Sequence, residues 1–470
     1  MSLILPGNVA TATAATGYTV ANSCRFNDGD SAYMHLTSGS AGNRRTFTFS
    51  CWYKRASITT GATQSLLVGS SCESFIDIGS NDKLIVAMQD SGGSPSVTTN
   101  QVFRDVGAWY HICIAVDTTQ GTDTNRIKIY INGTIIPVAD FTVTAWPSSN
   151  EQATFNDGNK HYLGANCSPG QYLDGYLAEV CLIDGQALTP TSFGEFDEDS
   201  PTIFKPIDVS GLTFGNEGWY LDFEDSGDLG DDESGNGNDF TEVNFAATDQ
   251  ATDTPTNNFC TMNPLFNGTG IWSSDIAVGG RTSEGNCKVV GGSHLPILGT
   301  LANNKMKVYY EVYISAADVV AGFMSTTPAG NSAHSYDDSF SNSIYVYGAG
   351  GSKINNGSWT STAGLTSAGN YMFAFDPVAG KMWFGKDGTW TGDPAAGSGN
   401  TWSSISSNEL WTPYFHTLNT TAYPAANFGG CSAFTVSSGN ADGNGYGNFE
   451  YAVPSGFYAL CTKNLAELGC

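Results

Sequence analysis

Basic residues are scarce in this chain of 470 residues, because 19 lysines and arginines stand against 45 aspartates and glutamates, a formal net charge of −26. A surface with this excess of negative charge repels phosphate backbones and anionic membranes. The composition therefore argues against a nucleic-acid partner. It is compatible with high salt, with cation binding or with simple solubility, and solubility is the plainest of the three explanations.

Long helical and long apolar segments are also missing. No long stretch repeats apolar residues at the helical spacing i, i+3, i+4, i+7, and no apolar run approaches the length of a membrane span. The N-terminus, MSLILPG, is too short and too uncharged for a signal peptide. We therefore expect a protein that folds in a cytosol without Sec export and without membrane insertion.

Motifs for metal binding and for catalysis are absent as well. The 11 cysteines show no CxxC spacing and no pairing with histidine, and the 6 histidines form no HxxxH pair. No G-x-S-x-G motif, glycine-rich phosphate loop or Cys/His nucleophile context occurs. We expect most cysteines to be reduced and buried, and we expect no enzymatic activity.

Turns and alternating strands are what the sequence contains instead. In residues 369–390, GNYMFAFDPVAGKMWFGKDGTW, apolar side chains alternate from Tyr371 to Phe375, a period typical of a half-buried strand. The segment 376–380 has turn chemistry, and a second short strand follows before Asp387-Gly388 turns the chain again. Repetition of this unit predicts an all-β protein of two antiparallel β-sandwiches joined by an acidic connector.

The first predicted sandwich, residues 1–205, carries four recognisable segments in order. They are FTFSCWYKR from Phe47, WYHICIAVD from Trp109, NRIKIYINGTII from Asn125 and YLDGYLAEVCLIDGQALTP from Tyr172. This order, over roughly Phe26 to Phe193, resembles the laminin G-like, concanavalin A-like lectin/glucanase domains. The resemblance implies two antiparallel sheets in a jelly-roll arrangement.

The second predicted sandwich, residues 265–463, resembles SPRY (B30.2-like) domains. The matching features are KVYYEV from Lys307, FAFDPVAGKMWFGKDG from Phe373, TPYF from Thr412, ANFG from Ala426 and PSGF from Pro454. The resemblance implies a two-sheet binding module whose loops hold the ligand. Residues 464–470 remain as a C-terminal tail, for which we expect a single helical turn.

Between the two sandwiches, residues 206–264 read as an acidic connector without a core of its own. Its phrases WYLDF, from Trp219, and LGDDESGNGNDF, from Leu229, resemble a connector in virion and tail-fibre proteins of marine tailed bacteriophages. In those proteins it links a laminin G-like domain to a SPRY domain.

Two interpretations of the connector's acidic residues stay open. Asp222, Asp225, Asp231 and Asp232 could ligate Ca²⁺, which prefers carboxylate and carbonyl oxygens. The segment lacks the spacing of an EF-hand loop. A hydrated acidic turn, with Gly235 and Gly237 at positive φ, is the interpretation that we favour.

Aromatic residues near predicted loops of the second sandwich are candidates for ligand contact. Trp359 and Trp390 could stack on sugar faces or anchor a protein interface. They could equally belong to the core of the sandwich.

The run Glu195-Phe-Asp-Glu-Asp199 is the closest approach to a glycosidase motif. Laminarinase-type enzymes of this fold carry E-x-D-x-x-E or E-x-D-x-E on a strand, where two carboxylates flank the scissile bond. Here the third acid is missing from that spacing, and the run follows the last predicted strand. We predict a solvated acidic loop.

The resemblances together imply a non-enzymatic virion protein, such as a tail fibre, spike or capsid-attached fibre, made in the bacterial host's cytoplasm. Its partners would be a host-surface glycan or other virion proteins, and by analogy it would form a homo-oligomer, with a trimer favoured. One alternative is a purely structural joining subunit without host binding, and a second is a polysaccharide-degrading glycanase. No cofactor is expected, apart from the Ca²⁺ alternative.

Overall fold

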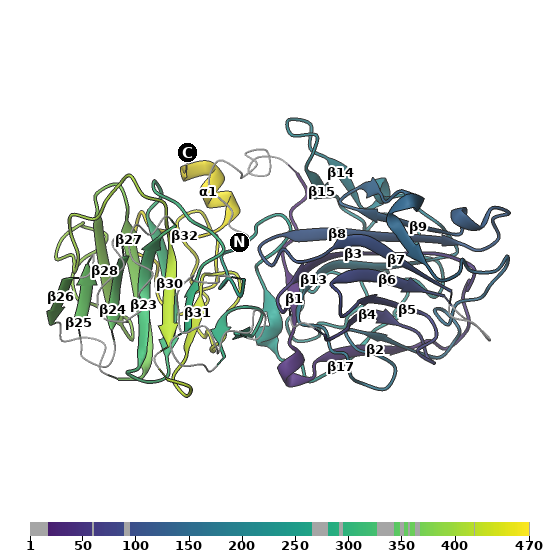
Figure 1. The fold of residues 1–470 in the computed structure, drawn as a ribbon, viewed down its shortest axis with the longest axis horizontal. Helices are drawn as coiled ribbons and strands as arrows, with labels where there is room; N and C mark the ends of the chain where they lie inside the picture. Colours follow the sequence, from purple (N-terminus) through teal and green to yellow (C-terminus); the bar gives the residue numbers. More distant parts are fainter. Residues whose placement is uncertain are drawn as a thin grey trace. The chain divides into compact units, whose positions relative to one another are not determined.

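Figure 1 shows a computed structural model of the chain, which describes residues 17–58, 61–88, 95–265, 281–290, 295–326, 343–347, 352–355, 358–361, 367–417 and 419–469. The chain divides into two compact units after Thr256. Each unit is built from packed β-sheets, so the predicted all-β class with two sandwiches is confirmed. None of the helices in these ranges has the length and apolar character that crossing a membrane requires.

The first unit is a sandwich of two antiparallel sheets, each of eight strands within the described ranges. One sheet has the order β10-β9-β8-β3-β13-β1-β18, with β16 beside β13. Its strands are β10 (Thr134–Ile135), β9 (Ile127–Ile131), β8 (Trp109–Asp117), β3 (Thr46–Arg55), β13 (Gly175–Asp184), β1 (Ser23–Phe26), β18 (Gln250–Ala251) and β16 (Trp219–Leu221).

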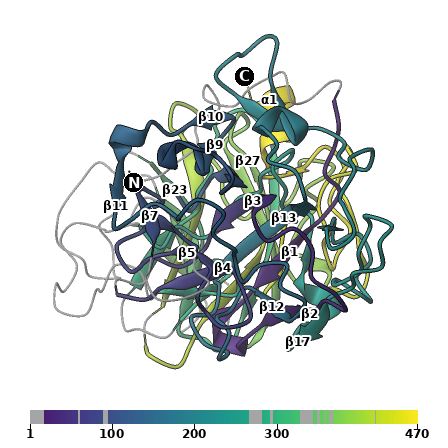
Figure 2. The same cartoon turned by 90° about the vertical axis from the view of Figure 1, so that its right-hand side faces the viewer.

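The other sheet of this unit has the order β11-β7-β6-β5-β4-β12-β2-β17. Its strands are β11 (Phe141–Val143), β7 (Ser96–Val102), β6 (Lys83–Ala87), β5 (Phe75–Ile78), β4 (Gln64–Val68), β12 (Lys160–Leu163), β2 (Tyr33–Thr37) and β17 (Thr241–Val243). Both views of the molecule show β17 running beside β2 (Figures 1 and 2).

Successive side chains of β3 point alternately into the core of the first sandwich and to its outer surface. Phe47, Phe49, Cys51 and Tyr53 all lie in the core between the sheets. On the outer face of β3, the ring of Trp52 lies 6.1 Å from that of Phe204, which belongs to β15 (Phe204–Pro206), the partner of β14 (Gly194–Phe196). The outer face of this sheet is therefore covered in part by its own chain.

The acidic segment after residue 205 is largely an integral part of the first unit. Trp219 packs edge-on against Phe240 at 4.8 Å between ring centroids, and both belong to the core between the sheets. Arg25 Nη2 pairs with Asp249 Oδ1 at 2.8 Å, and Lys54 Nζ pairs with Asp253 Oδ2 at 2.6 Å, all four side chains being buried. The unit boundary at Thr256 thus falls within the expected connector 206–264.

The second unit contains the predicted hairpin of β27 (Gly369–Asp376) and β28 (Lys381–Lys386). Its first sheet has the order β19-β20-β31-β22-β27-β28-β29, and β32 pairs with β22 in parallel. The other strands of this sheet are β19 (Thr282–Ser283), β20 (Lys288–Val289), β31 (Pro424–Asn427), β22 (Val308–Ile314), β29 (Thr389–Trp390) and β32 (Tyr458–Ala459).

The second sheet of this unit has the order β21-β30-β23-β24-β25-β26. The predicted alternation from Tyr371 to Phe375 is confirmed, since Phe373 and Phe375 lie in one core with Val308, Tyr310, Val312 and Ile314 of β22. The tail forms one short helix, α1 (Thr462–Leu468). The strands of the second sheet are β21 (Leu295–Leu298), β30 (Trp411–Thr417), β23 (Val319–Ser325), β24 (Ser343–Tyr347), β25 (Ser352–Asn355) and β26 (Ser358–Ser361).

A disulfide, which the sequence analysis did not predict, joins Cys72 and Cys167. It connects the β4–β5 loop to the β12–β13 loop. The eight other cysteines of the described ranges are free and buried, as expected for small apolar side chains.

Candidate functional site

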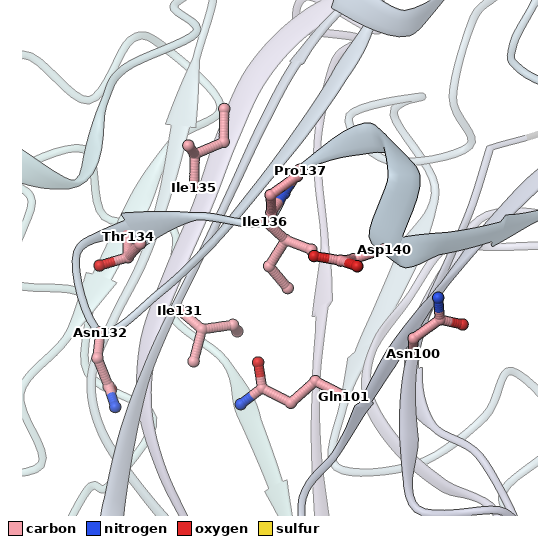
Figure 3. A pocket seen from close by; sticks show the side chains of 9 residues that line it. All are labelled: Asn100, Gln101, Ile131, Asn132, Thr134, Ile135, Ile136, Pro137 and Asp140. Atoms are coloured by element: carbon pink, nitrogen blue, oxygen red, sulfur yellow. The ribbon is translucent and has the colours of Figure 1, made fainter.

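A groove of about 500 Å³ lies beside the β9–β10 hairpin of the first unit (Figure 3). It is lined by the end of β7, by the hairpin and by the short 3-10 helix η5 (Val138–Asp140) that follows it. β10 is the edge strand of one sheet, and β11, which pairs with β7, is the edge strand of the other. The groove therefore opens where the edges of the two sheets meet.

Local sequence explains the shape of the hairpin. Asn132 and Gly133 both have positive φ, 47° and 75°, as a two-residue hairpin turn requires. Asn132 Oδ1 accepts a hydrogen bond from the backbone N–H of His111 at 2.8 Å, which anchors the turn to β8. Pro137 then starts η5, where the N–H of Asp140 donates to the carbonyl of Pro137. The result holds Asp140 over the groove.

The groove combines an apolar floor with polar side chains. Ile131 and Ile136 are buried, and Figure 3 shows Gln101 and Asp140 directed towards the same central space. Within the described residues, neither the Gln101 amide nor the Asp140 carboxylate has a hydrogen-bond partner in the protein. Their donors and acceptors are thus available to a ligand.

Three exposed apolar side chains belong to the segments that form the groove. Ile135, Val138 and Val102 expose 49%, 48% and 40% of their surface, and they are three of the four large apolar residues of the first unit that are exposed in the described ranges. Of the three, Ile135 lines the groove, whereas Val138 and Val102 are sequence neighbours of the lining residues Pro137 and Gln101. The lining contains one carboxylate, Asp140, whereas glycosidases use two.

The four aspartates considered for calcium lie around one turn of the first unit. Asp232 is buried, and its carboxylate accepts hydrogen bonds from the N–H groups of Tyr220, Ser234 and Asn238 and from the Ser234 hydroxyl. Asp222 accepts a hydrogen bond from the backbone N–H of Glu224, and Asp225 accepts one from that of Gly227. These contacts give the acidic residues a role in shaping the turn.

The described ranges contain no group of three or more His, Cys, Asp or Glu side chains that could hold a metal ion. Asp231 is largely exposed. The slight loss of solvent around its carboxylate and the negative charges of three nearby aspartates, Asp239, Asp228 and Asp225, raise its pKa. Gly235 and Gly237 have φ of 81° and 73°, as the hydrated-turn interpretation expects. The positive φ of both glycines agrees with the turn geometry that we expected, and calcium binding by the four aspartates stays a hypothesis.

The two candidate tryptophans lie in different surroundings. Trp390, at the end of β29, is partly buried, and its ring lies 6.2 Å from that of Tyr309 against a cluster that includes Phe449. This packing ties Trp390 to the core. Trp359 belongs to β26, opposite Ile354, but its side chain lies outside the described part of the chain.

The acidic run after Phe193 forms a small hairpin. Glu195 lies on β14, and Asp197 Oδ1 accepts hydrogen bonds from the N–H groups of Asp199 and Ser200, which closes a turn. Lys205 Nζ lies 3.3 Å from Glu195 and 3.5 Å from Asp197. The prediction of a solvated loop beyond the last strand is wrong here, because Glu195 lies on a strand that pairs with β15 and Asp197 is buried. The contacts with Lys205 and with the turn account for both carboxylates as structural groups.

Sequence reasoning missed the groove beside the β9–β10 hairpin. Gln101 and Asp140 belong to segments of unremarkable composition, and only the pairing of β7 with β11 brings them together. The one available signal was the pair of adjacent isoleucines, Ile135 and Ile136, directly after the turn. Of these, Ile135 is exposed and Ile136 is buried.

Part of the first unit matches a known protein family. Residues 28–192 match the concanavalin A-like lectin/glucanases superfamily. The match confirms the resemblance seen in the sequence between about Phe26 and Phe193. No curated protein matches the chain.

Several solved structures are similar at low identity. A candidate carbohydrate-binding protein of Bacteroides ovatus is 16% identical, with a TM-score of 0.34, over 48% of this chain and 58% of that one. A heptameric SAP-like pentraxin of Limulus polyphemus is 17% identical, with a TM-score of 0.28, over 37% of this chain and 80% of that one. The SPRY domain of human HERC1 is 14% identical, with a TM-score of 0.24, over 32% of this chain and 88% of that one.

Proposed function

We propose that the chain is a non-enzymatic binding protein whose first unit holds a neutral glycan in the groove beside the β9–β10 hairpin. The observation that carries the proposal is the pairing of an apolar floor with the unpartnered polar groups of Gln101 and Asp140. A pyranose ring presents apolar C–H faces and a rim of hydroxyls, so it complements both. The match of residues 28–192 to a lectin/glucanase superfamily supports a carbohydrate ligand.

Charge favours a neutral glycan over an acidic one. The groove is lined by one acidic and no basic side chain, and the chain carries a formal charge of −26. An anionic sugar would meet Asp140 without a compensating cation. Hydroxyl groups can instead donate to its carboxylate, and such charge-assisted hydrogen bonds are among the stronger ones.

The experiment is binding of the full chain to an array of neutral and acidic glycans, with Asp140→Asn and Gln101→Ala as test variants. Loss of a charge-assisted hydrogen bond, about 1.5–3 kcal/mol, predicts roughly a 10- to 100-fold weaker affinity. Asp123→Asn is the matched control, because Asp123 is an exposed acid in another 3-10 helix, η4 (Asp123–Asn125), away from the groove. Unchanged binding by both test variants would contradict the proposal.

For the whole chain we propose a place in a bacteriophage virion, made in the host cytoplasm, where the groove would bind a host-surface glycan. The support is the resemblance of the segments from Trp219 to Phe240 to a connector of such proteins. Display as a homo-oligomer, with a trimer favoured, would multiply weak contacts. Sedimentation equilibrium tests this part, and a monomer at micromolar concentration would count against it.

A purely structural joining subunit is the second candidate, and the exposed apolar side chains of Ile135, Val138 and Val102 are the observation in its favour. It predicts binding to other virion proteins and none to glycans. In that case the double variant Ile135→Asp, Val138→Asp would no longer bind the protein partner. The unmodified chain would bind no glycan on the array.

A further inference from the structure

A cluster of partly exposed aromatic rings lies on the first unit, away from the groove. Tyr33 is its centre, with ring centroids 6.2 Å from those of His35, Tyr162 and Tyr172. The ring planes are tilted by only 34–38° to that of Tyr33. We call these four residues the tyrosine platform.

Strand register places the platform on the outer face of the second sheet. On β2, Met34 and Leu36 lie in the core, so the alternate residues Tyr33 and His35 face outward. Tyr162 of β12 is paired with His35, while its neighbour Leu163 is in the core. Three outward rings from two adjacent strands thus form one surface.

Tyr172 joins the platform from the β12–β13 loop. The carbonyl of Gln171 accepts a hydrogen bond from Ser65 at 2.9 Å, and the N–H of Leu173 donates to Gly164 at 2.9 Å. The disulfide between Cys72 and Cys167 ties the same loop to the β4–β5 loop. The position of Tyr172 is therefore determined by the fold on both sides of the residue.

The platform lies outside the core of the unit. All four side chains are partly exposed, and none of the exposed aliphatic residues of the unit belongs to it. The hydroxyls of Tyr33, Tyr162 and Tyr172 have no hydrogen-bond partner among the described residues. Lys160 Nζ lies 5.9 Å from the Tyr162 ring, and burial followed by the charge of Lys160 lowers the pKa of His35.

We propose that the tyrosine platform is a second carbohydrate-binding surface, which takes a segment of neutral polysaccharide through the C–H faces of its sugar rings. Flat aromatic faces attract such C–H groups, and the three free phenol groups provide hydrogen bonds for neighbouring hydroxyls. A ligand that contacts both the aromatic faces and the phenol groups must present apolar faces next to hydroxyl groups. A polysaccharide has this arrangement. This site does not depend on the groove.

The test is affinity electrophoresis of the full chain in gels that contain a soluble neutral glucan, mannan or galactan. Tyr33→Ala and Tyr162→Ala are expected to weaken binding about tenfold each, because a stacking contact contributes roughly 1 kcal/mol beyond the area that it buries. Tyr33→Phe and Tyr162→Phe keep the ring and should stay within about threefold of the unmodified chain. Tyr130→Ala, at a partly buried tyrosine of the other sheet, is the matched control.

A second measurement does not depend on the folding of variants. Nitration of Tyr33, Tyr162 and Tyr172 by tetranitromethane should slow when the bound polysaccharide is present, while nitration of Tyr130 should not change. Equal binding by the alanine variants, or nitration rates that the polysaccharide leaves unaltered, would overturn the platform. If Asp140→Asn still weakens binding in that case, the groove stands alone, and binding to no polysaccharide at all would overturn both sites.

Discussion

Glu179 is an unusual residue within β13. It has a φ of 49°, where the pairing of β13 with β3 shifts register between Ala178 and Cys181. This bulge turns its carboxylate into a buried site, where it accepts hydrogen bonds from the hydroxyls of Tyr220 at 2.9 Å and Tyr18 at 3.2 Å. Burial raises the pKa of Glu179 to about 7, although the two tyrosines act in the opposite direction.

The raised pKa predicts a stability that falls as pH rises. The folded state keeps the Glu179 proton up to about pH 7, whereas the unfolded chain loses it near its ordinary value of 4.5. The free energy of unfolding should therefore decrease between about pH 4.5 and pH 7, by up to about 3 kcal/mol for this group. Glu179→Gln removes the titration, so urea unfolding of the variant should depend less on pH.

The comparison between the two proteins isolates Glu179. Asp77, whose pKa burial also raises to about 7, is present in both and cancels in the difference. Parallel pH profiles for the variant and the unmodified chain would show that the Glu179 carboxyl titrates normally.

At the scale of elements, the disulfide joins the loops that follow β4 and β12, two strands that are neighbours in the same sheet. Cys72 and Cys167 are 95 residues apart, and between them lie β5 to β12. The same link supports the loop that carries Tyr172. Neither cysteine stands in a recognisable spacing motif, so only the tertiary arrangement reveals the pair.

Removal of the disulfide should lower stability substantially. A Cys72→Ser and Cys167→Ser double variant is expected to lose about 4 kcal/mol of unfolding free energy, because a closed loop of this length restricts the unfolded chain strongly. Guanidinium unfolding with and without reductant measures the effect. Reductant should destabilise the unmodified chain and leave the double variant unchanged, and an equal response of both would contradict the prediction.

At the scale of the whole molecule, the first unit depends on residues beyond its laminin G-like segment. β16, β17 and β18 extend the two sheets, and Trp219 and Phe240 complete the core. Lys54 is only 1% exposed, and a chain without Asp253 would lack the buried ion pair between Lys54 Nζ and Asp253 Oδ2. A buried charge that loses its partner costs about 3–5 kcal/mol.

We expect a chain of residues 15–256 to fold on its own and a chain of residues 15–205 not to fold. The shorter chain loses both aromatic core residues and both aspartates that pair with Arg25 and Lys54. Thermal unfolding followed by circular dichroism should show a cooperative transition for the longer chain alone. A cooperative transition of similar midpoint in both would mean that the segment 206–256 contributes little.

The hairpin of residues 369–386 shows which structural features can be predicted from the local sequence pattern. Its two strands, its turn and its inward faces follow from alternation of period two and from Gly380, whose φ is 62°. These are short-range properties, since a strand's two faces and a turn's backbone angles depend on neighbouring residues. The strands of the first unit, such as β3 and β8, were predictable for the same reason.

The binding surfaces were not predictable in this way. Gln101 and Asp140 meet because β7 pairs with β11, and Tyr172 meets Tyr33 across 139 residues of chain because strand register and loop anchoring bring them together. The acidic segment concealed three strands for a similar reason, since two- and three-residue strands gain stability only from the sheet that they join. Fold class and strand faces are thus already contained in the order of residues, whereas both carbohydrate-binding candidates arise from long-range packing, which no local pattern encodes.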